Sequence, residues 1–131
     1  MTAIKNGTTN QINKERIFFS CPVTFTLERI GGRWKPLIIY NLLAGPLRYA
    51  ALRRSLPGIT EKMLIQQLKQ LEQDGLIIRK VEPVVPPHVE YSLTEAGHEM
   101  KEVLQAMSGW AFRHGTHLVA SEMNATSSIP V

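Results

Sequence analysis

The chain has 131 residues, 44% of them hydrophobic and 20% charged, which is the composition of one folded domain rather than of a disordered segment. Its formal net charge of +4 favours polyanionic partners without proving one. The single cysteine, Cys21, excludes an intramolecular disulfide and a multi-cysteine zinc site, and the longest apolar run, residues 37–44, is too short to cross a bilayer, so we expect a reducing, cytoplasmic setting and no membrane segment.

The pattern divides the chain into an arm, one domain and a tail. Residues 1–13 are polar and without periodicity, which predicts a flexible arm, and residues 122–131 predict a flexible tail. Residues 14–121 carry the regular apolar patterns of the domain. Its first helix begins at Pro22, which suits an opening turn, and the pair Gly31-Gly32 would end it.

A largely apolar helix over about residues 34–43 is predicted to be the central buried one. Its apolar side chains, which fill most of its circumference, are Leu37, Ile38, Tyr40, Leu42 and Leu43. Residues 47–49 leave room for one short extended segment, and a helix is expected over residues 50–56. Pro57-Gly58 then forces a tight turn before a helix over residues 60–75, which predicts a helix-turn-helix arrangement.

The helix over residues 60–75 has both ends written into its sequence. Thr60 is placed to cap the first turn, and Gly75 supplies a left-handed stop. Helical spacing gives it a core side with Leu64, Leu68 and Leu71 and an outward side with Lys62, Gln66, Lys69 and Gln73. Such an outward side suits base edges and phosphates, but Lys and Gln are also good helix formers on an ordinary solvated face.

Two strands follow this helix. Residues 76–81 are rich in β-branched side chains, and residues 89–93 alternate in character. The segment between them contains three prolines, which cannot continue a ladder and indicate a hairpin loop. A hairpin after a candidate reading helix is typical of a wing. We therefore predict an α+β, mainly helical fold, a winged helix-turn-helix with a two-stranded wing and additional N- and C-terminal helices for dimerisation.

The last helix, over residues 94–121, has more apolar surface than so small a domain is expected to cover. We interpret this surface, with an apolar patch near the N-terminus, as a dimer interface. The alternative is packing onto the chain's own first helix. The residues expected in the interface are Phe18, Phe19, Met100, Val103, Leu104, Met107, Trp110, Ala111 and Leu118.

A series of short strings between residues 21 and 110 supports this architecture through its order and spacing. They are Cys21-Pro22, Gly32-Arg33-Trp34-Lys35, Leu56-Pro57-Gly58-Ile59-Thr60, Met63-Leu64, Leu68, Leu71-Glu72, Asp74-Gly75-Leu76-Ile77, Pro86-Pro87-His88-Val89-Glu90-Tyr91-Ser92-Leu93-Thr94 and Gly97. Through them the chain resembles the HxlR-type regulators, winged helix-turn-helix transcription factors related to the MarR group. The resemblance implies a homodimer on a double-stranded DNA operator with pseudo-twofold symmetry, and family members usually repress.

The same resemblance implies that each subunit places the Thr60 helix in a major groove and the wing beside the backbone. Two positions depart from the family pattern. His88 stands where a basic residue is common, which makes a wing contact to phosphate weaker and dependent on pH. Ala50-Ala51 replaces polar or charged residues, which removes contacts to the DNA backbone from the first helix of the pair.

Candidate DNA-binding residues divide into two groups, because phosphate contacts supply affinity and base contacts supply sequence choice. The group expected to contact phosphate comprises Arg48, Arg53, Arg54, Lys62, Arg79 and Lys80, joined at the wing by His88. Gln66 and Gln67 are expected to contact bases, since an amide pairs bidentately with adenine. Thr60 serves either a phosphate or its own cap, and Met63 lies beside it in the first turn. The alternative for each cation is a solvated surface charge.

Cys21 is a candidate sensor. It precedes Pro22 at a helix start, where free amides and the positive end of the helix favour a thiolate. In several branches of the resembled family, a cysteine at this place senses oxidants or electrophiles. Lacking a second cysteine, this chain has available an intersubunit disulfide, a mixed disulfide or alkylation. The alternative is a buried structural thiol.

Other chemistry finds little support. His114 and His117 have one-turn spacing but no nearby carboxylate or thiol, so we expect no metal, and no motif indicates a cofactor or an enzyme. Two alternatives to a redox-responsive repressor stay open: a winged-helix protein-interaction module, and a regulator that responds to a non-covalent small molecule.

Overall fold

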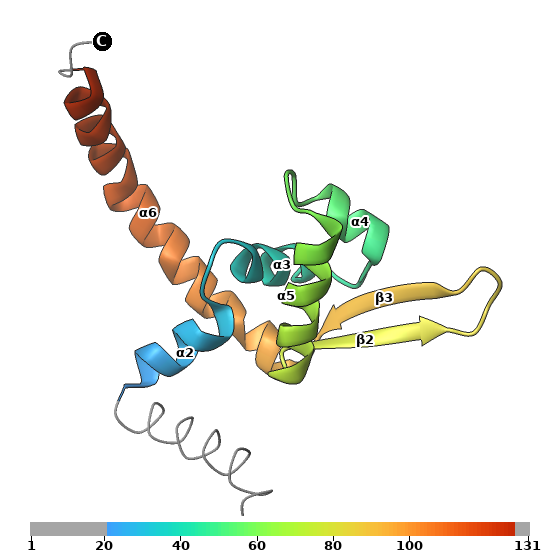
Figure 1. Ribbon diagram of the computed structural model, residues 1–131. Coiled ribbons are helices and arrows are strands. Elements are labelled where there is room, and N and C mark those ends of the chain that lie inside the picture. The colour runs from blue at the N-terminus through green and yellow to red at the C-terminus, as the bar shows by residue number, and fades with distance from the viewer. Residues whose placement is uncertain (1–20, 128–131) are drawn as a thin grey trace, which may run out of the picture.

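The computed structural model describes residues 21–127, and its side chains as far as residue 124 (Figure 1). The arm at residues 1–13 and the patch at Phe18 and Phe19 lie outside this range. In chain order the elements are α2 (Pro22–Ile30), α3 (Trp34–Leu42), β1 (Leu47–Arg48), α4 (Tyr49–Arg54), α5 (Glu61–Gln73), β2 (Ile77–Glu82), β3 (His88–Leu93) and α6 (Glu95–Ser127). This mainly helical architecture with a small antiparallel sheet confirms the predicted fold class.

Helix α5 begins and ends where local chemistry predicts. The Thr60 hydroxyl oxygen accepts a hydrogen bond from the Met63 amide at 3.1 Å, which confirms the cap. At the other end Gly75 has a φ of +74°, a value that glycine adopts without strain. The Leu76 amide then donates to the Leu71 carbonyl at 3.0 Å, so the final turn is closed by a Schellman arrangement. Both ends of the helix are therefore fixed.

The sheet has the strand order β1-β3-β2, and all its pairings are antiparallel. Strands β2 and β3 pair from Ile77 opposite Leu93 to Glu82 opposite His88, and their hairpin is the predicted two-stranded wing. The short extended segment is a third strand, because Leu47 pairs with Tyr91 and Arg48 with Glu90. The wing is thereby tied at its base to the residues that precede α4.

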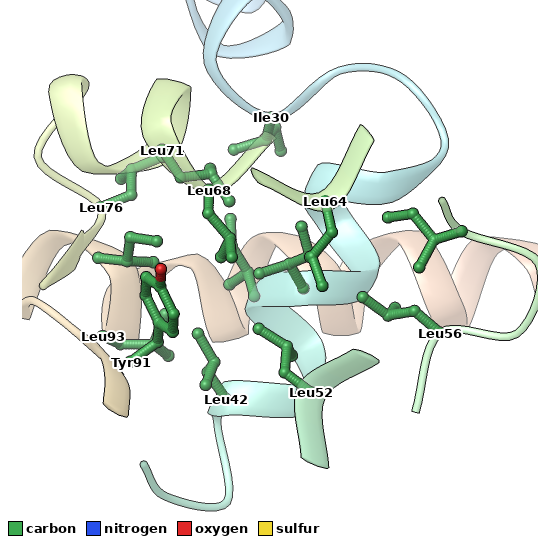
Figure 2. Packing of buried hydrophobic residues seen from close by; sticks show 14 of the residues in the cluster. Ile30, Leu42, Leu52, Leu56, Leu64, Leu68, Leu71, Leu76, Tyr91 and Leu93 are labelled. Carbon is green, nitrogen blue, oxygen red and sulfur yellow. The ribbon is translucent and has the colours of Figure 1, made fainter. Parts of the chain in front are cut away.

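The core lies where α3, α5 and the base of the sheet meet (Figure 2). Ile38, Ile39 and Leu42 of α3 are fully buried, which confirms α3 as the central helix. Its apolar side chains do not all enter the core, however, since Leu37 is 42% exposed and Tyr40 61% exposed. The expectation that α3 is buried around most of its circumference is wrong, because only the side with Ile38, Ile39 and Leu42 faces the core.

Helix α6 extends well beyond the body of the domain (Figure 1). It continues to Ser127 rather than ending at residue 121, because residues 116–127 contain neither glycine nor proline. Leu104, which we expected in a dimer interface, is buried in the core of its own chain, and Met100 and Val103 pack against that core. Within residues 21–127, none of the helices combines the length and the apolar content that a membrane span requires.

Candidate nucleic-acid interface

The outward face of α5 is exposed as predicted. Leu64, Leu68 and Leu71 are buried on the core side. The exposed polar residues on the outward side are Lys62, Gln66, Lys69 and Gln73. A helix held by three leucines and closed at both ends presents these groups on a rigid support. The N-terminal residues of such a helix are the ones that reach base edges in the major groove.

The structure separates the two glutamines that we predicted to contact bases. Gln66 is exposed, whereas Gln67 is half-buried. The Gln67 side-chain amide lies 3.8 Å from the Met63 sulfur, to which Nε2 donates a weak hydrogen bond. Gln67 and Met63 are therefore paired with each other along the edge of the helix. Gln66 is the amide free to approach a base.

A groove of about 760 Å³ lies between α5 and the wing. Its walls come from β1, α4, α5 and the two strands of the wing. The charged residues and the histidine among its lining are Arg48, Glu61, Lys69, Glu72, Arg79 and His88. Three of the predicted phosphate contacts, Arg48, Arg79 and His88, are thus brought together from three different strands, beside the exposed face of α5. The cations of this groove suit contacts to phosphates at the edge of a DNA major groove.

Other predicted phosphate contacts lie elsewhere. Arg53 and Arg54 are exposed in the last turn of α4, and they line a smaller groove of about 480 Å³ with the Pro57-Gly58 turn. Lys80 follows Arg79 in β2, so the two side chains project from opposite faces of the wing. Lys80 stands opposite Glu90. These basic residues therefore line two neighbouring grooves, which share Tyr49 and Ala50, and Lys80 adds a site on the far face of the wing.

Tyr49 is a residue that sequence reasoning missed, since it was counted only as part of an extended segment. It begins α4 and lines both grooves. Its hydroxyl is buried and has no hydrogen-bond partner among the described residues. Burial, and next the negative charge of Glu61, raise the pKa of the Tyr49 hydroxyl. Tyr49 stays neutral and packs the start of α4 against the core.

Thr94 also escaped prediction as a functional position. Its hydroxyl donates to the Gly75 carbonyl at 2.6 Å and accepts from the Gly97 amide at 3.1 Å. These bonds join the end of α5 to the start of α6. The orientation of α5 is therefore coupled to the long helix that leaves the domain.

Cys21 occupies the cap position before α2 with an extended backbone, as predicted, and is half-buried. The hydroxyl and then the amide of Thr24 stabilise the thiolate, so the pKa of Cys21 is lowered. The alternative interpretation was a buried structural thiol, and the Cys21 side chain is instead only partly buried.

Metal chemistry gains no support from the structure. The His114 ring lies near that of Trp110, with the ring centroids 5.4 Å apart and the ring planes tilted by 45°. Among residues 21–127 no group of three or more His, Cys, Asp or Glu side chains is placed to hold a metal ion.

Comparison with known proteins decides the family. The family description "HxlR-like helix-turn-helix" matches residues 29–118, from the end of α2 through most of α6. The chain belongs to the HxlR family. Two relatives are MalR, a regulatory protein of Fusobacterium mortiferum, and YkvN, an HTH-type transcriptional regulator of Bacillus subtilis. MalR is 52% identical over 93 residues, 70% of this chain and 88% of MalR. YkvN is 51% identical over 92 residues, 70% of this chain and 78% of YkvN.

The structure is also similar to solved structures of regulators, among them a redox regulator. The redox regulator HypR in its reduced form matches with a TM-score of 0.72 and 42% identity over 76% of this chain and 98% of HypR. The reduced form of the transcriptional regulator YodB from B. subtilis matches with a TM-score of 0.65 and 39% identity over 72% of this chain and 93% of YodB. The protein is therefore a transcriptional regulator with a winged helix-turn-helix fold.

Proposed function

We propose that this HxlR-family protein is a homodimeric, sequence-specific DNA-binding repressor that places α5 in the major groove and its wing beside the backbone. The observation that carries the proposal is the exposed row Lys62, Gln66 and Lys69 on a helix capped at Thr60. The groove with Arg48 and Arg79 continues this surface toward the wing. Cations at these places attract phosphates, and the Gln66 amide discriminates between bases.

Selection of bound fragments from the source genome tests this function. The expected result is enrichment of a sequence with pseudo-twofold symmetry, close to the protein's own promoter or a neighbouring one. Binding should weaken steeply as salt rises, because phosphate contacts release counterions. A reporter under the enriched sequence should fall when the protein is expressed. Failure to enrich any sequence would favour the protein-interaction module instead, and a rise in the reporter would identify an activator.

The homodimer is supported by apolar surface on α6. An apolar groove of about 770 Å³ is lined by Glu102, Val103, Ala106, Met107 and Trp110. Trp110 is 54% exposed in the single chain, and Leu118 is also exposed further along the helix. A second copy of α6 would cover these side chains. Ala111 lies on the exposed part of the same helix.

Replacing Trp110 by glutamate should weaken dimerisation at least about tenfold, because it buries a charge in an apolar contact. Analytical ultracentrifugation over a range of concentrations measures the change. Gln105→Glu is the matched control, since Gln105 is exposed on the opposite side of α6. Equal dimerisation of the Trp110 variant and the control would remove this part of α6 from the interface, and its groove would then be a candidate site for a non-covalent effector.

A response to oxidants or electrophiles through Cys21 is the second part of the proposal. Its support is the lowered pKa of Cys21 and the likeness to the redox regulators HypR and YodB. The thiolate is the reactive form of cysteine, so a lowered pKa favours modification of Cys21. We propose that this modification releases DNA. A Cys21→Ser protein should bind the enriched sequence normally and keep it in the presence of oxidant. If that variant still releases DNA on oxidation, Cys21 is not the sensor.

The pH dependence of Cys21 alkylation tests its environment. Below its pKa a thiol is protonated and unreactive, so a lowered pKa moves the rise in alkylation rate to lower pH. Thr24→Val removes the hydroxyl that lowers this pKa, and the midpoint of the rate profile should move to higher pH. Thr26→Val is the control, because the Thr26 hydroxyl donates to the Pro22 carbonyl at 2.9 Å. Identical profiles for both variants would show that Thr24 does not tune the thiol.

A further inference from the structure

Two apolar side chains stand on the exposed surface of α5, next to Gln66. Ile65 is 41% exposed and Met63 is 38% exposed. Neither is needed for the core, since Leu64, Leu68 and Leu71 fill the buried side of this helix. An exposed apolar residue alone requires no explanation, but these two flank Gln66, the exposed amide in the N-terminal half of the helix proposed to face DNA.

Their surroundings distinguish Ile65 from Met63. The Met63 sulfur is occupied by the Gln67 amide at 3.8 Å, on the edge of α5 away from the wing. Ile65 instead lines the groove between α5 and the wing, beside Lys69 and with Arg79 across it. As a β-branched residue in a helix, Ile65 has one strongly preferred rotamer. It therefore presents a fixed apolar surface in a groove whose charged lining includes Lys69 and Arg79 as well as Glu61 and Glu72.

A chemical group in duplex DNA fits this position. In the major groove only thymine carries an apolar substituent, its C5-methyl group, and an amide such as that of Gln66 pairs with adenine. Residues 65 and 66 are separated by about 100° around a helix axis. Their side chains can therefore contact two different but neighbouring bases in the DNA major groove. Lys69 and Arg79, which line the same groove, are cations that would attract the neighbouring phosphates.

From this geometry we infer that Ile65 determines specificity by contacting the C5-methyl group of a thymine next to the adenine that Gln66 reads. The inference rests on the proposed function, because it requires α5 to enter the major groove. Burial of one methyl group should strengthen binding about fourfold. Ile65 would then select A·T pairs by contact with carbon, in addition to the hydrogen bonds of Gln66.

Deoxyuridine tests the inference, because it differs from thymidine by the absence of that methyl group alone. The affinity of the full-length protein is measured for its enriched duplex with each thymine replaced in turn. We expect one position in each half-site to lose about fourfold in affinity. The Ile65→Ala protein should bind the unsubstituted duplex about fourfold more weakly and lose nothing further at that position. Met63→Ala should retain the full deoxyuridine effect.

Two outcomes would overturn the inference while leaving DNA binding intact. These are an equal deoxyuridine loss in the wild-type and Ile65→Ala proteins, or no sensitive position in a duplex that the protein still prefers to unrelated DNA. Absence of any preferred duplex would instead overturn the proposed function itself. Circular dichroism of both variants establishes that each is folded before its affinity is compared.

Discussion

Replacing Gln66 by alanine is expected to cost about 1 to 3 kcal/mol of binding free energy on the enriched operator, with the loss confined to one base position in each half-site. Gln66 is the exposed amide in the N-terminal half of α5. Its replacement would remove the hydrogen-bond partner of one base edge. Competition binding with operators altered one base pair at a time measures the effect. The variant should no longer discriminate at that position and should discriminate normally at all others.

Arg54→Ala is the contrasting substitution. Arg54 is exposed at the end of α4, away from the row of side chains on α5. Its replacement should weaken operator and unrelated DNA to a similar extent and reduce the slope of log affinity against log salt by about 1. Gln73→Ala is the control for loss of an amide on the same helix, since Gln73 lies in the last turn of α5. Equal losses from Gln66→Ala and Arg54→Ala on every sequence would contradict the division into base and phosphate contacts.

The features predicted correctly from the sequence are those that depend on a few neighbouring residues. The cap at Thr60 and the stop at Gly75 are local, because each acts on the backbone within one turn. The wing followed from prolines that interrupt two β-rich segments. The pairing of β1 with β3 was not predicted, because it joins residues more than forty positions apart in the chain.

The errors concern which side of a helix is covered. Tyr40 and Leu37 were placed in the core from their apolar character, yet they are exposed in the single chain. Leu104 was placed in an interface and is buried in its own core. Periodicity tells which residues share a face, but not whether the same chain or a second one covers it. That information lies only in the packing of α3 and α6.

The candidate site shows the same limit on a smaller scale. Gln66 and Gln67 are chemically identical neighbours, and only burial separates the one that is free from the one paired with Met63. Arg79 and Lys80 are likewise adjacent cations, and the alternation of the strand sends them to opposite faces of the wing. The type of a residue indicates which contacts it could make. The direction of its side chain determines which of two adjacent, similar residues can make them.

Substitution of Leu64, which anchors α5 in the core, is expected to have a large effect on stability. Leu64 is 0% exposed and points into the cluster that also contains Leu52 and Leu56 (Figure 2). Leu64→Ala should lower the free energy of unfolding by about 2 to 5 kcal/mol, through lost burial and the cavity that remains. Urea denaturation measures this change, at a fixed protein concentration so that the proposed dimerisation contributes equally to each measurement.

Ile65→Ala is the matched control for that substitution, since it removes the same number of carbon atoms from the adjacent residue. Because Ile65 is 41% exposed, its truncation should cost less than about 1 kcal/mol of stability. Leu64→Ala should therefore mainly lower the free energy of unfolding, whereas Ile65→Ala should mainly change the affinity for DNA. Similar unfolding free energies for both variants would mean that α5 is not anchored through Leu64. In a folded Leu64→Ala protein, the affinity for the operator should fall more than the affinity for unrelated DNA. A less firmly held α5 keeps its charges, which bind any DNA, but loses its alignment with the bases.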